Sequence, residues 1–158
     1  MPPVRKVLDL TLPLEACPAV HAEDTLKEAV AVLRAGATKG ETALLVVGEE
    51  GQPVGILTLE LLLQAFEPDF VETSTWKLPV FWNTFFDDKC REQVRRKVRD
   101  VMQPLECVAT VEARDPLPKA LHVMVTSGLP LLPVAKDGRI IGVLRINELF
   151  EAIGKAIG

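Results

Sequence analysis

The sequence predicts a mixed α/β fold (α+β) made of two similar units, each with the order strand, helix, strand, strand, helix (β-α-β-β-α). The first observation is an internal repeat: between positions 13 and 29, eight of seventeen residues are identical to those 91 positions further on. The second is size. One copy of about 60 residues would be marginally stable alone, whereas the whole chain has 158 residues, 48% of them apolar. A repeat of this length indicates one small fold built twice and packed on itself.

The first half of the second copy predicts a strand followed by a helix. Residues 107–111 form a short apolar run, which favours a strand. Asp115 is a favourable N-cap, and Pro116 suits the first position of a helix. Ser127-Gly128 is expected to end this helix. The apolar residues that recur at helical spacing are Leu117, Ala120, Leu121 and Met124.

The second half of this copy predicts a hairpin and a closing helix. Residues 131–134 read as a buried strand. Lys136-Asp137-Gly138 is a turn sequence, so residues 139–144 are expected to form the returning strand. Residues 147–153 then predict a short final helix.

The first copy follows the same order. Asp24 is expected to cap its helix, while Thr25 and Glu28 form a capping box if the cap lies one residue later. The remaining elements are two strands and the turn between them: residues 43–47, 54–57 and 49–51.

The repeat divides the chain into three parts. We expect a first repeat at residues 1–67, a connecting segment at 68–97 and a second repeat at 98–158. The offset between the copies falls from 91 to 87 after the first helix, so the first copy carries four extra residues near 36–41. They predict a longer loop from helix to strand.

Composition excludes several classes of protein. A net charge of −4 argues against general nucleic-acid binding. No apolar run approaches the length of a membrane span. The N-terminus lacks the apolar stretch of a signal peptide, so we expect a cytoplasmic protein.

Reactive and metal-binding groups are scarce in the sequence. Three cysteines are widely spaced and only two histidines exist, so buried reduced thiols are favoured over a zinc site. No Ser-His-Asp set, paired-carboxylate motif or phosphate-binding loop appears. We therefore expect neither an enzyme nor a required cofactor.

Four stretches of the two copies carry a family resemblance: Val98–Met102, Gly128–Val134, Asp137–Leu144 and, more loosely, Glu50–Thr58. With these stretches in this order, the pair of copies resembles a tandem pair of CBS domains, the arrangement called a Bateman module. The resemblance covers about residues 4–67 and 97–155.

The resemblance implies an architecture and a class of ligand. The two repeats would pack sheet to sheet about a pseudo-twofold axis, leaving two clefts between them. Two such modules usually pair into a flat disc, so a homodimer is implied. The family's ligands are adenosine derivatives such as AMP, ADP, ATP or S-adenosylmethionine, and its members act as sensors rather than catalysts.

The ligand-holding pattern of the family is incomplete in both copies. It has a Thr or Ser for phosphate and, three residues later, an acid for ribose. The first copy has Thr58, but Leu61 stands at the acid position; the second has Glu148, but Arg145 replaces the hydroxyl.

We therefore favour the second cleft as the ligand site. Glu148 is expected to accept the ribose diol, and Arg145 to meet a phosphate. Thr110, Leu132 and Pro133 are expected to line the adenine slot. The alternative is that Arg145 and Glu148 are helix-start charges that pair with each other.

The connecting segment is apolar and bulky, unlike a flexible linker. One interpretation is that it packs across the module. The other is that it presents an interface for self-association or a protein partner. The residues that would form this interface are Trp76, Phe81, Trp82, Phe85 and Phe86.

Two functions remain open at this point. The leading hypothesis is a stand-alone regulatory CBS pair that binds an adenosine-containing ligand between its repeats and signals by conformational change. The alternative is a degenerate pair that serves as a dimerisation or docking scaffold without nucleotide.

Overall fold

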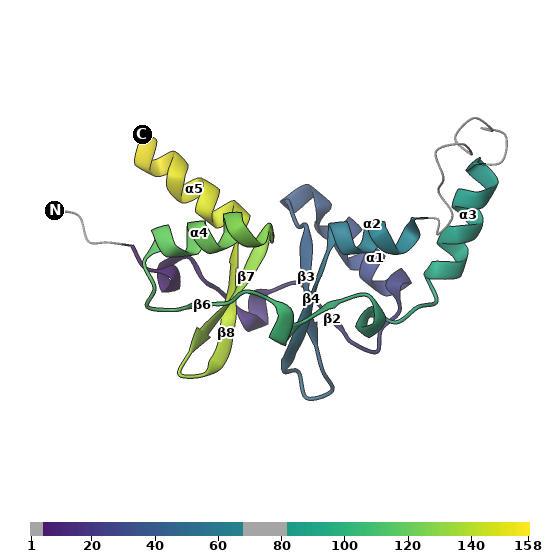
Figure 1. Cartoon of the computed structure of the whole chain (residues 1–158), viewed down its shortest axis with the longest axis horizontal. Coiled ribbons are helices and arrows are strands. Elements are labelled where there is room, and N and C mark those ends of the chain that lie inside the picture. The colour runs from purple at the N-terminus through teal and green to yellow at the C-terminus, as the bar shows by residue number, and fades with distance from the viewer. Residues whose placement is uncertain (1–4, 68–81) are drawn as a thin grey trace.

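Two four-stranded sheets lie next to each other in the middle of the molecule, each with its own helices (Figure 1). The computed structural model describes residues 5–67 and 82–158, with the side chains of 82–85 left out. The mixed α/β fold built from two repeats is therefore confirmed.

The first repeat supplies three strands of one sheet. Strand β2 pairs in parallel with β3, and β3 pairs antiparallel with β4. The helices α1 and α2 lie beside this sheet (Figure 1). The bounds are β2 Ala19–His21, α1 Leu26–Gly36, β3 Ala43–Val47, β4 Pro53–Thr58 and α2 Leu59–Phe66.

The second repeat supplies three strands of the other sheet in the same arrangement. Strand β6 is parallel to β7, which pairs antiparallel with β8. The bounds are β6 Val111–Glu112, α4 Leu117–Ser127, β7 Leu131–Lys136, β8 Arg139–Arg145 and α5 Ile146–Ile157. The helix α3 (Trp82–Gln93) precedes this repeat and lies beyond α1 and α2 (Figure 1).

Each sheet is completed by a two-residue strand from the other repeat. Strand β1 (Leu12–Pro13) pairs with β8, and β5 (Gln103–Pro104) pairs with β4. The sheet orders are therefore β1-β8-β7-β6 and β2-β3-β4-β5. The two repeats exchange their edges, so neither sheet is complete without residues of the other repeat.

Close backbone approach explains a glycine in each repeat. A Cβ on Gly55 would lie 2.5 Å from the Gln103 carbonyl oxygen. A Cβ on Gly142 would overlap the Leu12 carbonyl oxygen in the same way. Only glycine lets the exchanged strands come this near.

The helix starts differ from the expectation at both aspartates. Thr25, with Glu28, caps α1 through a capping box, which confirms the alternative of a cap one residue later. Pro116 holds the N-cap position of α4. Asp24 and Asp115 instead accept hydrogen bonds from backbone N–H groups three residues earlier. Their carboxylates close the turn before each helix, which the short Asp side chain does readily.

The strand expected at residues 107–111 is mostly wrong. Leu105–Cys107 forms a 3-10 turn, and the strand β6 consists of Val111 and Glu112 alone. The hairpin was placed correctly: Asp137 and Gly138 have φ of 52° and 79°, as a tight type I′ turn requires.

The core has three parts, because alternate strand residues face opposite sides of each sheet. Two clusters lie between a sheet and its helices, and each takes one fully buried valine from the other repeat: Val7 in the cluster of the second repeat and Val98 in that of the first. A third cluster draws on both sheets and joins the repeats: Ala43, Leu45, Ile56, Val108, Leu131 and Val143.

Candidate functional site

Arg145 lies where the two repeats meet. It is the last residue of β8 and the N-cap residue of α5. Its Nε donates to both carboxylate oxygens of Glu148 at 3.0 Å, and its Nη2 donates to the same carboxylate. Its Nη1 donates to Oε1 of Glu41 at 3.0 Å. One guanidinium therefore holds two carboxylates, one from each repeat.

Glu41 reaches Arg145 from the inserted loop of the first repeat. The loop contains a 3-10 turn, Ala37–Lys39, and then Gly40, whose carbonyl accepts from Nδ2 of Asn147 at 3.5 Å. The extra residues seen in the sequence thus form a longer connection, as predicted, and it contacts the start of α5.

The ion-paired side chains are largely enclosed. The side chain of Glu41 is 11% exposed, that of Arg145 23% and that of Glu148 27%. Their hydrogen bonds raise the pKa of Arg145, and the bond to Glu148 is the largest cause. Half-buried charges are screened less by salt than surface charges, so this triad keeps much of its electrostatic strength.

The cavity at this seam is very small. Its volume is about 10 Å³, on the limit of what one water molecule needs. Residues of both repeats line it: Gly40, Glu41, Thr42, Ala43, Pro130, Leu131, Arg145 and Asn147.

The other predicted residues of the second cleft are spread out. The side chain of Leu132 is fully buried in the core of its own repeat, and Pro133 is buried as well. Thr110 is exposed just before β6. Leu131, the neighbour of Leu132, lines the seam cavity, because strand residues alternate between the two faces.

The corresponding position of the first repeat is differently occupied. Thr58 is the N-cap of α2, and its hydroxyl accepts a hydrogen bond from the backbone N–H of Leu61 at 3.1 Å. The side chain of Leu61 packs against the core of the first repeat. This helix start is satisfied by its own side chain.

Comparisons with known proteins agree with this architecture. The family model of the CBS domain matches residues 7–68 and again residues 98–155. The chain belongs to the CBS domain family. By sequence, no curated protein matches this CBS pair.

Solved CBS-pair structures share the fold. CBSX2 from Arabidopsis thaliana is 20% identical, with a TM-score of 0.72 and 98% of each chain covered. CBSX2 in complex with AMP is 19% identical, with a TM-score of 0.67, over 97% of this chain and 98% of that one. The CBS domain pair of MJ0100, in complex with 5′-methylthioadenosine and S-adenosylmethionine, is 18% identical, with a TM-score of 0.67, over 98% and 99%.

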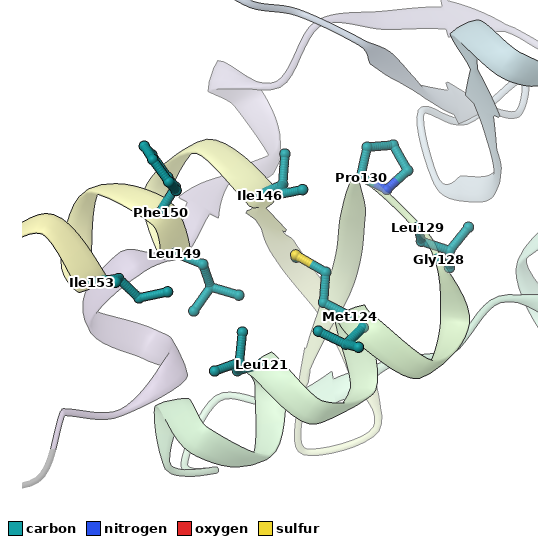
Figure 2. A pocket seen from close by; sticks show the side chains of 10 residues that line it. Leu121, Met124, Gly128, Leu129, Pro130, Ile146, Leu149, Phe150 and Ile153 are labelled. Atoms are coloured by element: carbon teal, nitrogen blue, oxygen red, sulfur yellow. The ribbon is translucent and has the colours of Figure 1, made fainter.

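This CBS pair also carries two apolar grooves on its helices. The larger, about 380 Å³, lies between α4 and α5. Figure 2 shows Leu121 and Met124 of α4 opposite Leu149 and Ile153 of α5, with Phe150 above them. The matching groove of the first repeat, about 300 Å³, lies between α1 and α2. Sequence periodicity had pointed to helices here, but not to the exposure of Phe150, which is 72% exposed.

The aromatic and basic residues before the second repeat are only partly described. Trp76 and Phe81 lie outside the described residues, and Trp82 and Phe85 are placed by their backbone in α3. Phe86 is 59% exposed. Further on, Lys97 and Arg99 both pair with Glu23 of the first repeat, at 2.6 and 2.7 Å.

The thiol of Cys17 is held in its neutral form by its surroundings. Burial raises the pKa of Cys17 to about 11, although Arg145 acts in the opposite direction. Its Sγ donates to the Pro13 carbonyl at 3.3 Å. Cys17 is therefore a half-buried packing residue. Cys90 is also half-buried and Cys107 is exposed, so the expectation of buried thiols is wrong for Cys107.

Within the part of the chain that the structure describes, no three His, Cys, Asp or Glu side chains gather as a metal site would need. None of the helices in residues 5–67 and 82–158 is both long and apolar enough to cross a bilayer.

Proposed function

We propose that this CBS pair is a regulatory module that binds an adenosine-containing ligand at the seam beside Arg145 and signals by a change in how its repeats pack. The observation that carries the proposal is the triad of Arg145, Glu148 and Glu41. It places a guanidinium and a carboxylate at the start of α5, next to residues of both repeats. A ligand seated there would touch both halves of the molecule.

The bound ligands of two similar structures support the ligand class. One was crystallised with AMP and the other with 5′-methylthioadenosine and S-adenosylmethionine. Glu148 is the residue we assign to the ribose diol, as the family pattern implies.

The small size of the cavity gives the proposal its signalling step. A volume of about 10 Å³ does not hold an adenosine. Binding therefore requires the seam between the repeats to widen. A ligand shifts such an equilibrium only by the difference between its affinities for the open and closed forms.

Titration with adenosine compounds tests the proposal. AMP, ADP, ATP, 5′-methylthioadenosine and S-adenosylmethionine are added in turn while the melting temperature is followed. At least one is expected to raise it, because a ligand at 100 times its Kd adds about 2.7 kcal/mol of stability.

Two variants locate the binding. Glu148→Ala is expected to abolish the rise, and Glu148→Gln serves if the alanine variant folds poorly. Glu151→Ala, at an exposed position of α5, is the matched control and should keep the rise. No shift with any compound would instead favour a scaffold without nucleotide.

A second candidate function, homodimerisation through the helical faces, rests on the paired grooves. Both grooves are apolar and are built at equivalent places in the two repeats. Phe150 and Val125 beside the larger groove are 72% and 71% exposed. A self-complementary face with both a groove and protruding apolar side chains suits a twofold contact with a second copy.

Molar mass in solution tests the dimer. Phe150→Glu is expected to convert a dimer into a monomer, because a charge there would be buried without a partner. Leu8→Glu changes an exposed leucine, 47% exposed, that lines neither groove, and should leave the mass unchanged. A monomeric wild-type protein would contradict this proposal.

A further inference from the structure

The charges at the seam do not balance. Arg145 contributes one positive charge, while Glu41 and Glu148 contribute two negative charges. All three side chains are at most 27% exposed. The field in this cavity is therefore set by one excess carboxylate, and enclosure concentrates it.

Each of the three guanidinium nitrogens of Arg145 already donates to a carboxylate. Nε and Nη2 bind Glu148, and Nη1 binds Glu41. A phosphate that approached Arg145 would either displace Glu41 or become a third anion beside one cation. Displacing Glu41 would break its ion pair with Arg145. A third anion would be repelled, because like charges that lie close and poorly solvated repel strongly. Either course lowers the affinity for phosphate.

The four extra residues of the first repeat are what bring Glu41 to this place. Glu41 follows Gly40, and its backbone N–H bonds back to Gly36 at 3.1 Å. Gly40 is in turn held to the second repeat by Asn147. The carboxylate of Glu41 is thus a fixed part of the seam rather than a loose surface charge.

We infer that Glu41 makes this site select adenosine derivatives whose 5′ group is neutral or positively charged over those that carry a 5′-phosphate. The inference rests on the proposed function. It narrows the ligand class: 5′-methylthioadenosine is uncharged there, S-adenosylmethionine carries a sulfonium, and AMP carries a phosphate dianion. In this protein Glu41 adds the excess negative charge beside the arginine that a phosphate would need.

Binding affinities measured by calorimetry test the selectivity. The wild-type protein is expected to bind 5′-methylthioadenosine or S-adenosylmethionine at least about tenfold more tightly than AMP. Glu41→Gln keeps the size and an acceptor oxygen but removes the charge. The variant is expected to bind AMP about tenfold more tightly than wild type and to bind S-adenosylmethionine more weakly.

Glu49→Gln is the matched control, since it makes the same charge change at an exposed residue of the β3–β4 turn. It should leave the ratio of AMP to 5′-methylthioadenosine affinities unchanged. The unfolding temperature without ligand shows whether each variant is folded.

The outcomes separate the two proposals. Equal affinities for AMP and 5′-methylthioadenosine, unaltered by Glu41→Gln, would overturn the selectivity and leave the adenosine site standing. Failure of all adenosine compounds to bind wild type and Glu41→Gln alike would overturn the proposed function itself.

Discussion

At the residue scale, equivalent positions of the two repeats make different interactions. Thr58 and Arg145 both hold the N-cap position of a final helix. Thr58 is 6% exposed and turns its hydroxyl onto its own helix. Arg145 instead reaches outward and pairs with carboxylates of both repeats. The repeat is therefore symmetric in its backbone and asymmetric in its chemistry.

Asp115 shows a pH-dependent contribution at the same scale. Its carboxylate accepts from the Glu112 N–H at 2.9 Å and pairs with Lys119 at 3.2 Å. These interactions lower the pKa of Asp115, with the backbone hydrogen bond as the largest cause. Because the folded pKa is below the unfolded one, the contribution is present above the unfolded value of about 3.9 and is lost as pH falls through the folded pKa.

Asp115→Asn is therefore expected to destabilise the protein at neutral pH by no more than about 1 kcal/mol, since the pair is partly solvated. The difference in unfolding free energy between the variant and wild type should disappear as the pH falls below about 4. Urea unfolding across pH measures it. Lys119→Met should keep most of the pH dependence, because the backbone bond remains; a gap of constant size at every pH would contradict the prediction.

At the element scale, the exchanged edge strands depend on backbone contact. The Cα partners of β1 on β8 are Val143 for Leu12 and Gly142 for Pro13. Two-residue strands have few hydrogen bonds, so the close approach at Gly142 matters for how β1 is seated. A side chain there has no room without moving the backbone.

Gly142→Ala is expected to destabilise the fold by about 1–3 kcal/mol, the usual range for overpacking. Gly154→Ala is the matched control, since that glycine is in α5 with open space around its Cβ position. It should stabilise the helix by up to about 1 kcal/mol. Equilibrium unfolding in urea gives both values, and two changes of the same sign would count against this account of β1.

At the scale of the whole molecule, the repeats share one interface core. Leu45, Ile56, Leu131 and Val143 are all buried in the cluster that joins the two sheets. With the exchanged edges, this cluster makes each repeat part of the other's structure. The two halves are therefore expected to unfold together.

Leu45→Ala is expected to lower stability by about 2–4 kcal/mol, because it leaves a cavity between the sheets. Hydrogen exchange should show reduced protection in the strands of both repeats. Leu33→Ala, in the cluster between the first sheet and its helices, should act mainly on the first repeat. Loss of protection confined to the first repeat in Leu45→Ala would speak against a shared core.

Local pattern predicted the regular elements well and the short ones poorly. The strand at 43–47 and the 136–138 turn follow from apolar runs and turn residues, and both are as expected. Strands β1 and β6 are two residues long, too short for any periodicity to appear. Asp24 and Asp115 were misplaced as caps because an Asp closes a turn as readily as it caps a helix.

The candidate site was predictable in part. Arg145 and Glu148 are three residues apart, and their pairing was one of the two possibilities drawn from the sequence. Glu41 was missed as a member, because it lies 104 residues from Arg145. The inserted loop is visible in the sequence as a change in the offset between the two copies. The sequence does not show that this loop contacts Arg145.

By itself the sequence determined the doubling and the order of elements, because these follow from residue spacing along short stretches of chain. Only the tertiary structure decided which repeat completes which sheet and which carboxylate faces Arg145. Those pairings join segments far apart in the chain. Which segments meet depends on how the intervening chain folds, and local periodicity does not encode that. The difference between the two repeats at the seam of this CBS pair arises in this way.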